Sequence, residues 1–389
     1  MLPVLIIVAA LSAGQSSGAD SNAAPQAPTA PAPDRWLLMQ ALQGTWPGWL
    51  LDERRISISG WTDFSYTASS AENDNLPLGF NHRANEFLLQ QNWVRIDRPV
   101  IQTGTEPSYG FRSDWILPGA DYKFTRALGL LDGQTARHGF DPIQFYGEAY
   151  FPTIAKGMDV KFGHFVSQIC VEVNDAPSNA LFSHAYGFIY DPFTHTGLLT
   201  TTRLTDAWSV QAGIVLGSDI FIHAGDEPTF LGSVKWARPD GRDSVQLSVI
   251  AGSGRYNQHE NVNNPEVLDF IYSHQFNSRL SYNVDMMFGY QDHVPEIGNA
   301  YWYEMVHYLT YNFTPRLSGT ARLELFDDDQ GQRTGSKGLY TALTAGVAFK
   351  PWKWATIRPE LRYDYNGRSR PFEDQHGLFT AATDVILRW

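Results

Sequence analysis

The sequence predicts an all-β protein, a transmembrane antiparallel up-and-down β-barrel of about sixteen strands, within the range of bacterial barrels. Three patterns support this fold. Segments of about ten residues alternate between polar and apolar side chains, which is the period of a strand with two different faces. The connections between these segments alternate between short and long. After the N-terminal region, no apolar run approaches the ~20 residues that a membrane-spanning helix needs.

The N-terminal region divides into three parts before the barrel. Residues 1–19, "MLPVLIIVAALSAGQSSGA", combine a short apolar core with small residues before a cleavage site after Ala19, as in a secretory signal peptide. Residues 20–34 are rich in Ala and Pro and predict an extended tether. Residues 35–55 predict a short periplasmic or plug segment, with an interfacial anchor as the alternative. The barrel then occupies residues 56–389.

Three segments show the alternation most clearly, at 280–291, 317–327 and 356–365. In the second, Leu323 and Leu325 belong to one face, whereas Arg322 and Glu324 belong to the other. In a soluble sheet the polar face would contact bulk water, but in a membrane barrel it faces the lumen. The strands are expected near 56–67, 87–97, 109–117, 142–151, 158–166, 197–205, 208–216, 229–236, 245–250, 266–276, 280–291, 301–313, 317–327, 338–349, 356–365 and 379–389.

The connections keep the short and long alternation along the whole series. Long connections are expected around 68–86, 118–141, 167–196, 217–228, 251–265, 292–300, 328–337 and 366–378. Short periplasmic turns opposite long extracellular loops are typical of outer-membrane barrels, and an even strand number places both termini in the periplasm. One connection, 98–108, is longer than this pattern predicts.

Aromatic residues mark one rim of the predicted barrel. Five tryptophans lie at strand ends or in a short turn: Trp208, Trp236, Trp352, Trp354 and Trp389. Amphipathic rings favour the headgroup level of a membrane, so we expect a girdle on the periplasmic side. Two residues do not fit the pattern, because Pro359 lies in the middle of a strand and His307 falls on an apolar face.

Charged residues on the strands indicate a wet interior. The inward set is expected to line the pore and comprises Asn283, Asp285, Arg322, Glu324, Arg358, Glu360, Arg362 and Asp364. An ionised side chain facing lipid near the midplane would cost several kcal/mol, so these residues must face water if the strands cross a membrane. The alternative is the salt-bridged surface of a soluble sheet. In the barrel, charges of both signs on neighbouring walls create a transverse field across a channel for passive diffusion.

The long connection 167–196 is the expected constriction loop. It carries many aromatic residues, and long loops of this kind are usually functional. Folding into the lumen would bury the rings and narrow the channel, while packing over the mouth or in a subunit interface is the alternative. The residues assigned to this constriction are Phe182, His184, Asp191, Phe193 and His195.

Several segments resemble the outer-membrane β-barrel porin family described as OmpL-like. The matching residues are Gly60-Trp61, the stretch from Lys161 to Phe165, Ser183-His184 and the block "PFTHTG" at 192–197. Cys170 departs from the family, in which a Gly-Glu turn is commoner at this place. The resemblance implies an outer-membrane porin for small hydrophilic solutes or ions, assembled by the barrel-assembly machinery, and a homotrimer is common in this class.

Other chemistries find little support in the sequence. The net charge of −12 argues against a nucleic-acid partner. His164, His184, His195 and His223 lack the close pairing that a metal site needs. Ser183, His184 and Asp191 lack the spacing of a catalytic triad, and Asp327 to Asp329 lack the later Glu of a calcium loop. We therefore expect no cofactor and no enzymatic activity, and keep an outer-membrane barrel enzyme and a soluble periplasmic all-β binding protein as alternatives.

Overall fold

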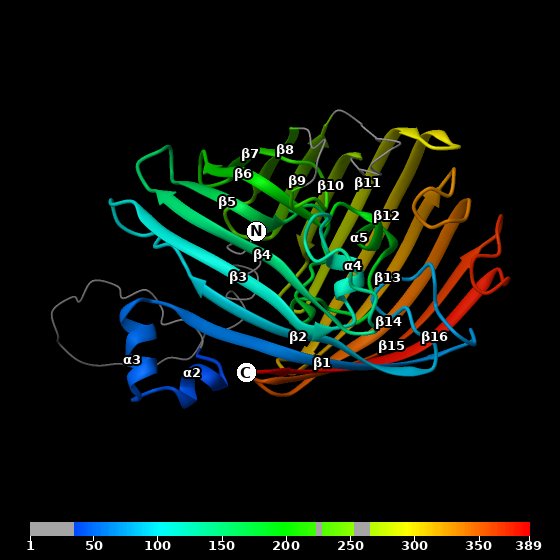
Figure 1. Cartoon of the computed structure of the whole chain (residues 1–389), viewed down its shortest axis with the longest axis horizontal. Coiled ribbons are helices and arrows are strands. Elements are labelled where there is room, and N and C mark those ends of the chain that lie inside the picture. The colour runs from blue at the N-terminus through cyan, green and yellow to red at the C-terminus, as the bar shows by residue number, and fades with distance from the viewer. Residues whose placement is uncertain (1–34, 223–227, 253–264) are drawn as a thin grey trace.

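Sixteen antiparallel strands close into a single barrel in the computed structural model, which describes residues 35–222, 228–252 and 265–389 (Figure 1). Every strand pairs with its neighbours in sequence, and the last strand pairs with the first. The predicted fold class is therefore confirmed. The strands are β1 Ser57–Ser69, β2 Glu86–Arg98, β3 Ser108–Gly119, β4 Gly139–Phe151, β5 Met158–Val166, β6 Thr194–Arg203, β7 Trp208–Val215, β8 Thr229–Ala237, β9 Asp243–Ala251, β10 Glu266–Gln275, β11 Leu280–Val294, β12 Gly298–Thr314, β13 Leu317–Asp328, β14 Gly338–Trp352, β15 Ala355–Asn366 and β16 Gly377–Arg388.

The barrel closes between β1 and β16, where Trp61 lies opposite Arg388. The last residue continues this ladder, because Trp389 N donates to Gly60 O at 2.9 Å and its carbonyl accepts from Gly60 N at 3.1 Å. At the other end of the seam, the Glu373 carboxylate accepts three backbone N–H groups, from Glu72 at 2.6 Å and from the next two residues. A strand that runs to the final residue thus pairs along its whole length.

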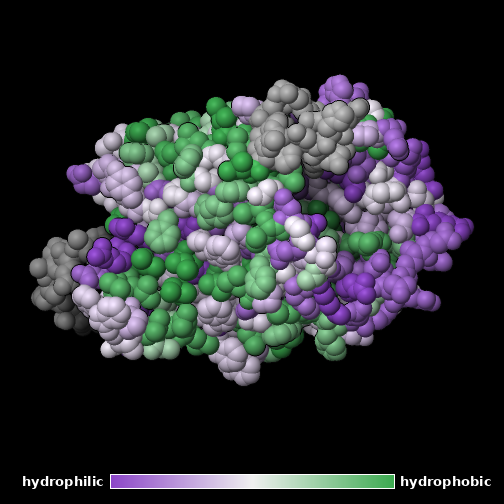
Figure 2. All heavy atoms as spheres, viewed as in Figure 1, coloured by the Kyte–Doolittle hydropathy of each residue, from purple (hydrophilic) through white to green (hydrophobic). Residues whose placement is uncertain are grey.

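Side chains alternate between the lumen and the outer surface as the sequence predicts. On β13, Arg322 is fully buried inside while the neighbouring Leu323 is 46% exposed outside. Figure 2 shows hydrophobic residues gathered over the strands and hydrophilic residues at the end where the long β13–β14 and β15–β16 connections lie. A soluble sandwich would bury the apolar face instead, so this arrangement contradicts that alternative.

The connections alternate between short and long as predicted, with one correction. The connection expected at 292–300 is a tight hairpin tip, because β11 and β12 continue to Val294 and Gly298. The paired strands simply extend further than the sequence signal suggests. The connection after β2 runs from 99 to 107 and remains long at the short-turn end.

Pro359 and His307, the two residues that did not fit the sequence pattern, both lie in strands and face outward. Pro359 pairs with Thr383 of β16, but the β14–β15 ladder is interrupted opposite it, between Gly346 and Phe349. This gap matches the N–H donor that proline lacks. His307 satisfies its polarity on the outer face through a 2.7 Å hydrogen bond between its Nδ1 and the Tyr282 hydroxyl.

Two short helices precede the barrel, α2 Leu37–Ala41 and α3 Trp46–Glu53. Thr45 caps α3, because its hydroxyl accepts from Gly48 N at 3.2 Å. The helices lie beside the end of β16 and the start of β1 (Figure 1). No helix within the described ranges is both long and apolar enough to span a membrane. The predicted signal peptide and tether at 1–34 lie outside the described residues.

Candidate functional site inside the barrel

The long connection between β5 and β6, residues 167–193, is bound to the inner wall of the barrel. It contains a 3₁₀ turn, η1 Ala176–Ser178, and a short helix, α5 Tyr186–Tyr190. Inward carboxylates of β11, β12, β13 and β15 accept hydrogen bonds from its backbone N–H groups. These bonds join Val171 to Asp285 (2.7 Å), Phe182 and Ser183 to Glu360 (2.8 and 3.1 Å), Tyr186 to Glu324 (3.1 Å) and Gly187 to Glu304 (2.8 Å).

Three inward arginines bind the carbonyl groups of the same segment. Arg358 donates to Ala176 O at 2.8 Å and to Asn179 O at 2.9 Å. Arg322 donates to Ser183 O, and Arg362 donates to His184 O at 2.6 Å. The charged wall therefore binds the loop backbone, with carboxylates on its donors and guanidinium groups on its acceptors.

The same charges also pair with one another. Arg322 lies 2.7 Å from both Glu324 on its own strand and Glu172 of the loop. Arg362 pairs with Asp364 at 2.8 Å, and Arg358 pairs with Asp384 of β16. The desolvation cost of these buried charges is offset because each partner keeps its counter-charge and its hydrogen bonds.

Glu172 of the loop contacts both the charged wall of the barrel and another residue of the loop. Its carboxylate contacts Arg322, accepts from the Tyr308 hydroxyl at 3.0 Å and lies 2.7 Å from His184 Nδ1. Burial opposes ionisation of this carboxyl, but the Arg322 guanidinium and the His184 hydrogen bond outweigh it and lower the pKa to about 2. Glu172 is therefore charged at neutral pH.

Two other connections pack against this loop. Phe80 of the β1–β2 connection lies 4.4 Å from the His184 ring and 5.6 Å from Phe188, measured between ring centroids. Phe124, in the helix α4 Tyr122–Thr125 after β3, lies 5.2 Å from Phe80. Aromatic side chains from three connections thus share one apolar cluster, which buries rings that would otherwise face solvent.

The residues assigned to the constriction are all buried, but at different places. Phe182 and His184 lie on the part of the loop that contacts β13 and β15. Asp191 accepts from the Cys170 thiol, where the outgoing and returning parts of the loop meet. Phe193 and His195 lie at the base of the loop, where His195 Nδ1 is 2.9 Å from Gly217 O.

These hydrogen-bond partners also bear on the catalytic triad and the metal site that the sequence raised. His184 pairs with Glu172 and Asp191 with Cys170, so Ser183, His184 and Asp191 do not form a relay. His164 contacts the Thr196 hydroxyl at 2.8 Å, and His223 lies outside the described residues. Within the described part of the chain, no group of three metal-ligating side chains is placed to hold an ion.

Comparison with known protein families matches residues 55–388 to the family described as "Putative beta-barrel porin-2, OmpL-like". The chain belongs to this porin family. No curated protein sequence gives a significant match.

Solved structures similar to this porin include a porin, an outer membrane channel and an outer membrane protein. The anion-selective porin from Comamonas acidovorans has a TM-score of 0.61 at 10% identity, covering 86% of this chain and 99% of that one. The outer membrane channel DcaP of Acinetobacter baumannii has a TM-score of 0.56 at 11% identity, covering 86% and 96%. The trimer form of OmpT from Vibrio cholerae has a TM-score of 0.56 at 11% identity, covering 86% and 99%. At such low identity these likenesses support the fold.

The porin's predicted pore-lining residues point inward but lie mostly beneath the loop. Asp285, Arg322, Glu324, Arg358, Glu360, Arg362 and Asp364 are each at most 4% exposed, whereas Asn283 is half-buried. Their charges are taken up by the loop backbone and by one another. The wall formed by β11 to β16 is therefore a docking surface for the loop.

The opposite wall keeps its polar side chains accessible. Inward positions of β4 to β8 include half-buried residues of both charges and several neutral hydrogen-bonding groups. They are Glu148, Asp159, Lys161, Thr201, Ser209, Ser233 and Lys235, whereas Gln211 of β7 donates to the Gln168 side chain of the loop. These residues were not among the predicted pore-lining set, although the alternation in 158–166 and 229–236 places Lys161 and Lys235 on the inward phase.

Part of the porin's lumen is apolar, which the sequence analysis missed. Trp61 and Trp93 stack inside the barrel with ring centroids 4.7 Å apart, and Trp302 is fully buried on β12. Arg95 lies over the Trp61 ring at 5.6 Å. These tryptophans occupy inward positions of the alternating pattern, and this could have identified the apolar part of the lumen from the sequence. A wholly polar lumen would not have large aromatic rings at inward positions.

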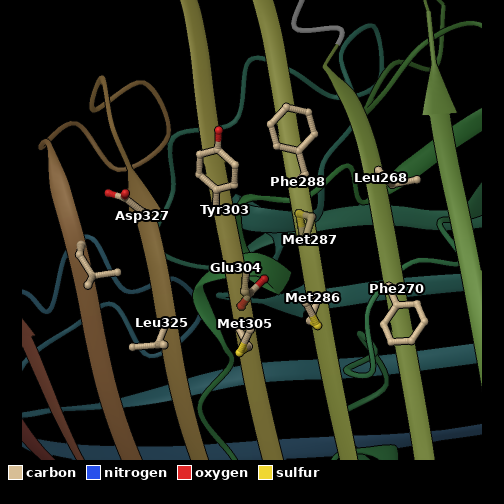
Figure 3. A pocket seen from close by; sticks show the side chains of 11 residues that line it. Leu268, Phe270, Met286, Met287, Phe288, Tyr303, Glu304, Met305, Leu325 and Asp327 are labelled. Atoms are coloured by element: carbon tan, nitrogen blue, oxygen red, sulfur yellow. The ribbon is translucent and has the colours of Figure 1, made fainter.

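An apolar depression on the outer surface has no part in this site. It has a volume of 420 Å³ and is lined mainly by outward side chains of β10 to β14 (Figure 3). Phe270, Met286, Phe288, Tyr303 and Met305 are among the residues that line it, as Figure 3 shows. These residues belong to the apolar face that a membrane barrel presents to lipid.

Proposed function

We propose that this porin conducts small hydrophilic solutes and ions by passive diffusion, along a water path between the docked loop and the inward face of β4 to β8. The observation that carries the proposal is the contrast between the two walls. One wall holds the loop through buried charges, whereas the other leaves Lys161, Lys235 and Asp159 partly accessible.

A path of this kind needs neither a cofactor nor energy coupling. Groups that line it exchange hydrogen bonds with passing water and solute. The accessible charges have both signs, with Lys161 facing Glu148 across the β4–β5 pair. Selectivity would then depend on these residues, and the arginines beneath the loop would contribute only through the long-range field.

The setting of the channel follows from the same fold. We propose that the short-turn end and both termini face the periplasm of a Gram-negative-type bacterium, and that lipid covers the apolar outer face. Export through a signal peptide, insertion by the barrel-assembly machinery and assembly as a homotrimer complete the proposal. The OmpT neighbour is described in a trimer form, which supports the last point.

Deleting residues 178–190 tests the role of the loop. Because this part of the loop covers β13 to β15, its removal should widen the lumen and raise the single-channel conductance in planar bilayers. The matched control replaces the same residues with a Gly/Ser segment of equal length, which keeps the chain length and removes the docking contacts. Unchanged conductance in a correctly folded deletion variant would remove the loop from the permeation path.

An outer-membrane barrel enzyme is the alternative function. The porin family and the fold favour a channel. Planar-bilayer recording separates the two, since an enzyme of this class need not conduct. Discrete, ohmic current steps from the purified protein support the channel, and their absence at high protein density would contradict it.

A further inference from the structure

The two N-terminal helices expose large hydrophobic side chains at the short-turn end of the barrel. Trp46 is 72% exposed, Trp49 is 58% exposed and Leu37 is 43% exposed. Trp46 and Trp49 are three residues apart on α3 and therefore lie on one side of the helix. We call the exposed side chains of these three residues the Trp46 surface.

Specific contacts attach these helices to the barrel rim. The Arg388 guanidinium lies over the Trp36 ring at 3.8 Å, and Lys353 Nζ lies over the same ring at 5.5 Å. Arg55 donates to Pro99 O at 2.6 Å from the opposite end of the segment. Cation–π contacts and a hydrogen bond on both sides hold the helices in one place beside the β1–β16 seam.

The rim at this place already carries exposed aromatic residues. Trp352 and Trp354 flank Lys353 in the β14–β15 turn, with parallel rings whose centroids are 5.0 Å apart. Trp352 is 59% exposed, and the strands that lead into this turn expose Phe349 and Val347 outward. Lys353 contacts Trp36, so the start of α2 lies against the turn at which this apolar outer wall ends.

The charges around the helices suit an anionic surface. Three basic residues lie next to the helices, two directly after α3 and one in the β14–β15 turn, whereas the helices themselves carry only Asp52 and Glu53. Asp52 is already paired with Arg35 at 3.1 Å. The basic residues are Arg54, Arg55 and Lys353.

We propose that α2 and α3 rest on the bilayer, with the Trp46 surface in the headgroup region of the leaflet at the short-turn end, where the basic residues contact anionic phospholipid. Tryptophan rings favour this level, and a polar, cationic flank strengthens binding to anionic lipid. The segment would then act as an anchor that extends the aromatic girdle beyond the barrel wall. This inference goes beyond the diffusion channel and does not depend on it.

Single nitroxide labels in reconstituted vesicles test this placement. The sole cysteine, Cys170, is buried, so the parent protein measures the background labelling. Two variants carry the label on the helix, one at Trp46→Cys and one at Trp49→Cys. Each variant keeps the other tryptophan. Thr103→Cys, in the exposed 99–107 connection, serves as the aqueous reference, and Leu343→Cys, 58% exposed in the middle of β14, as the lipid reference.

The measurement is the collision rate of each label with oxygen and with a water-soluble nickel complex, in phosphatidylethanolamine vesicles with and without phosphatidylglycerol. We expect positions 46 and 49 to resemble the lipid reference more than Thr103, with lower nickel accessibility when phosphatidylglycerol is present. Nickel accessibility equal to that at position 103 would overturn the proposal in favour of a periplasmic segment in water. Protection from both reagents would overturn it in favour of a plug or a contact with a second protein copy. Heat-modifiable migration confirms that each variant has folded.

Discussion

Arg322 contacts both the backbone and the side chains of the loop. Its guanidinium binds Ser183 O and Ser183 Oγ, the second at 3.0 Å, while it also pairs with Glu172 and Glu324. Breaking a buried pair by removing one partner costs about 3–5 kcal/mol, because the other charge stays buried. Arg322 therefore makes a large contribution to the attachment of the loop to the wall.

The first prediction concerns this residue. Arg322→Met should release the loop, because Glu172 loses its arginine counter-charge and Glu324 keeps only Arg362. Planar-bilayer records should then show larger and more variable current steps. Arg203→Met is the matched control, since Arg203 is inward but exposed near the rim. Equal, quiet conductance in both folded variants would show that the Arg322 pairs do not hold the loop.

The second prediction concerns pH. The Glu172 pKa is lowered from 4.5 to about 2, so the stabilisation from its ionised form is complete above pH 4.5 and is lost as the pH falls towards 2. We expect constant conductance and noise from pH 5 to 8, and growing fluctuations only below about pH 3. Loop release already at pH 6 would contradict this assignment.

Among the elements, the final strand depends on its last residue. The Trp389 backbone adds two hydrogen bonds to the β1–β16 seam, and its ring packs on Gly60 so closely that a Cβ there would lie 2.5 Å from it. Closure of a barrel removes its exposed strand edges, so the seam is where an incomplete ladder matters most.

The third prediction therefore removes Trp389. Its deletion should sharply lower the yield of heat-modifiable, membrane-inserted protein and leave unfolded protein in the periplasm, because the seam closes with an unpaired Gly60. Trp389→Phe keeps the backbone bonds and an aromatic ring, and should retain most of the yield. A normal membrane yield from the deletion variant would refute the idea.

The sequence is a good guide to the strands because lipid and lumen impose opposite requirements on alternate residues. The side chains of Arg322 and Leu323 must point to opposite faces of the strand, whatever loops follow it. The hairpin at 292–300 resembles a loop in sequence because polar residues such as Asp292 occur there. The β14–β15 gap opposite Pro359 shows that a closed barrel tolerates a missing donor locally.

The candidate site was less predictable, because it depends on where the loop lies. The inward set from Asp285 to Asp364 could be identified by phase alone, but its burial could not. Contacts between Glu360 and Ser183, or Arg358 and Ala176, join residues far apart in the chain that no periodic signal links. The role of Glu172 likewise becomes visible only when the barrel is closed, whereas the inward position of Trp93 could have been identified from its phase.

The whole molecule has an asymmetric interior. The β11 to β16 wall uses its charges to hold the loop, whereas polar side chains on the β4 to β8 wall remain partly accessible. The fourth prediction follows for selectivity: Lys235→Gln should shift the reversal potential in a salt gradient towards cations, because it removes an accessible positive charge. Ser233→Ala, at the preceding inward position of the same strand, is the neutral control and should leave the reversal potential unchanged. An equal shift in both variants would contradict a specific role for the Lys235 charge.

Cysteine accessibility during current recording tests this asymmetry most directly. Single cysteines at Thr201 and Lys235 report on the uncovered wall, and cysteines at Thr344 and Thr380, each at most 1% exposed, report on the wall beneath the loop. A charged, water-soluble thiol reagent should change the current in steps at positions 201 and 235 and leave it unchanged at 344 and 380. Reaction at 344 and 380 with no effect at 201 and 235 would place the permeation path on the other side of the loop and contradict the account.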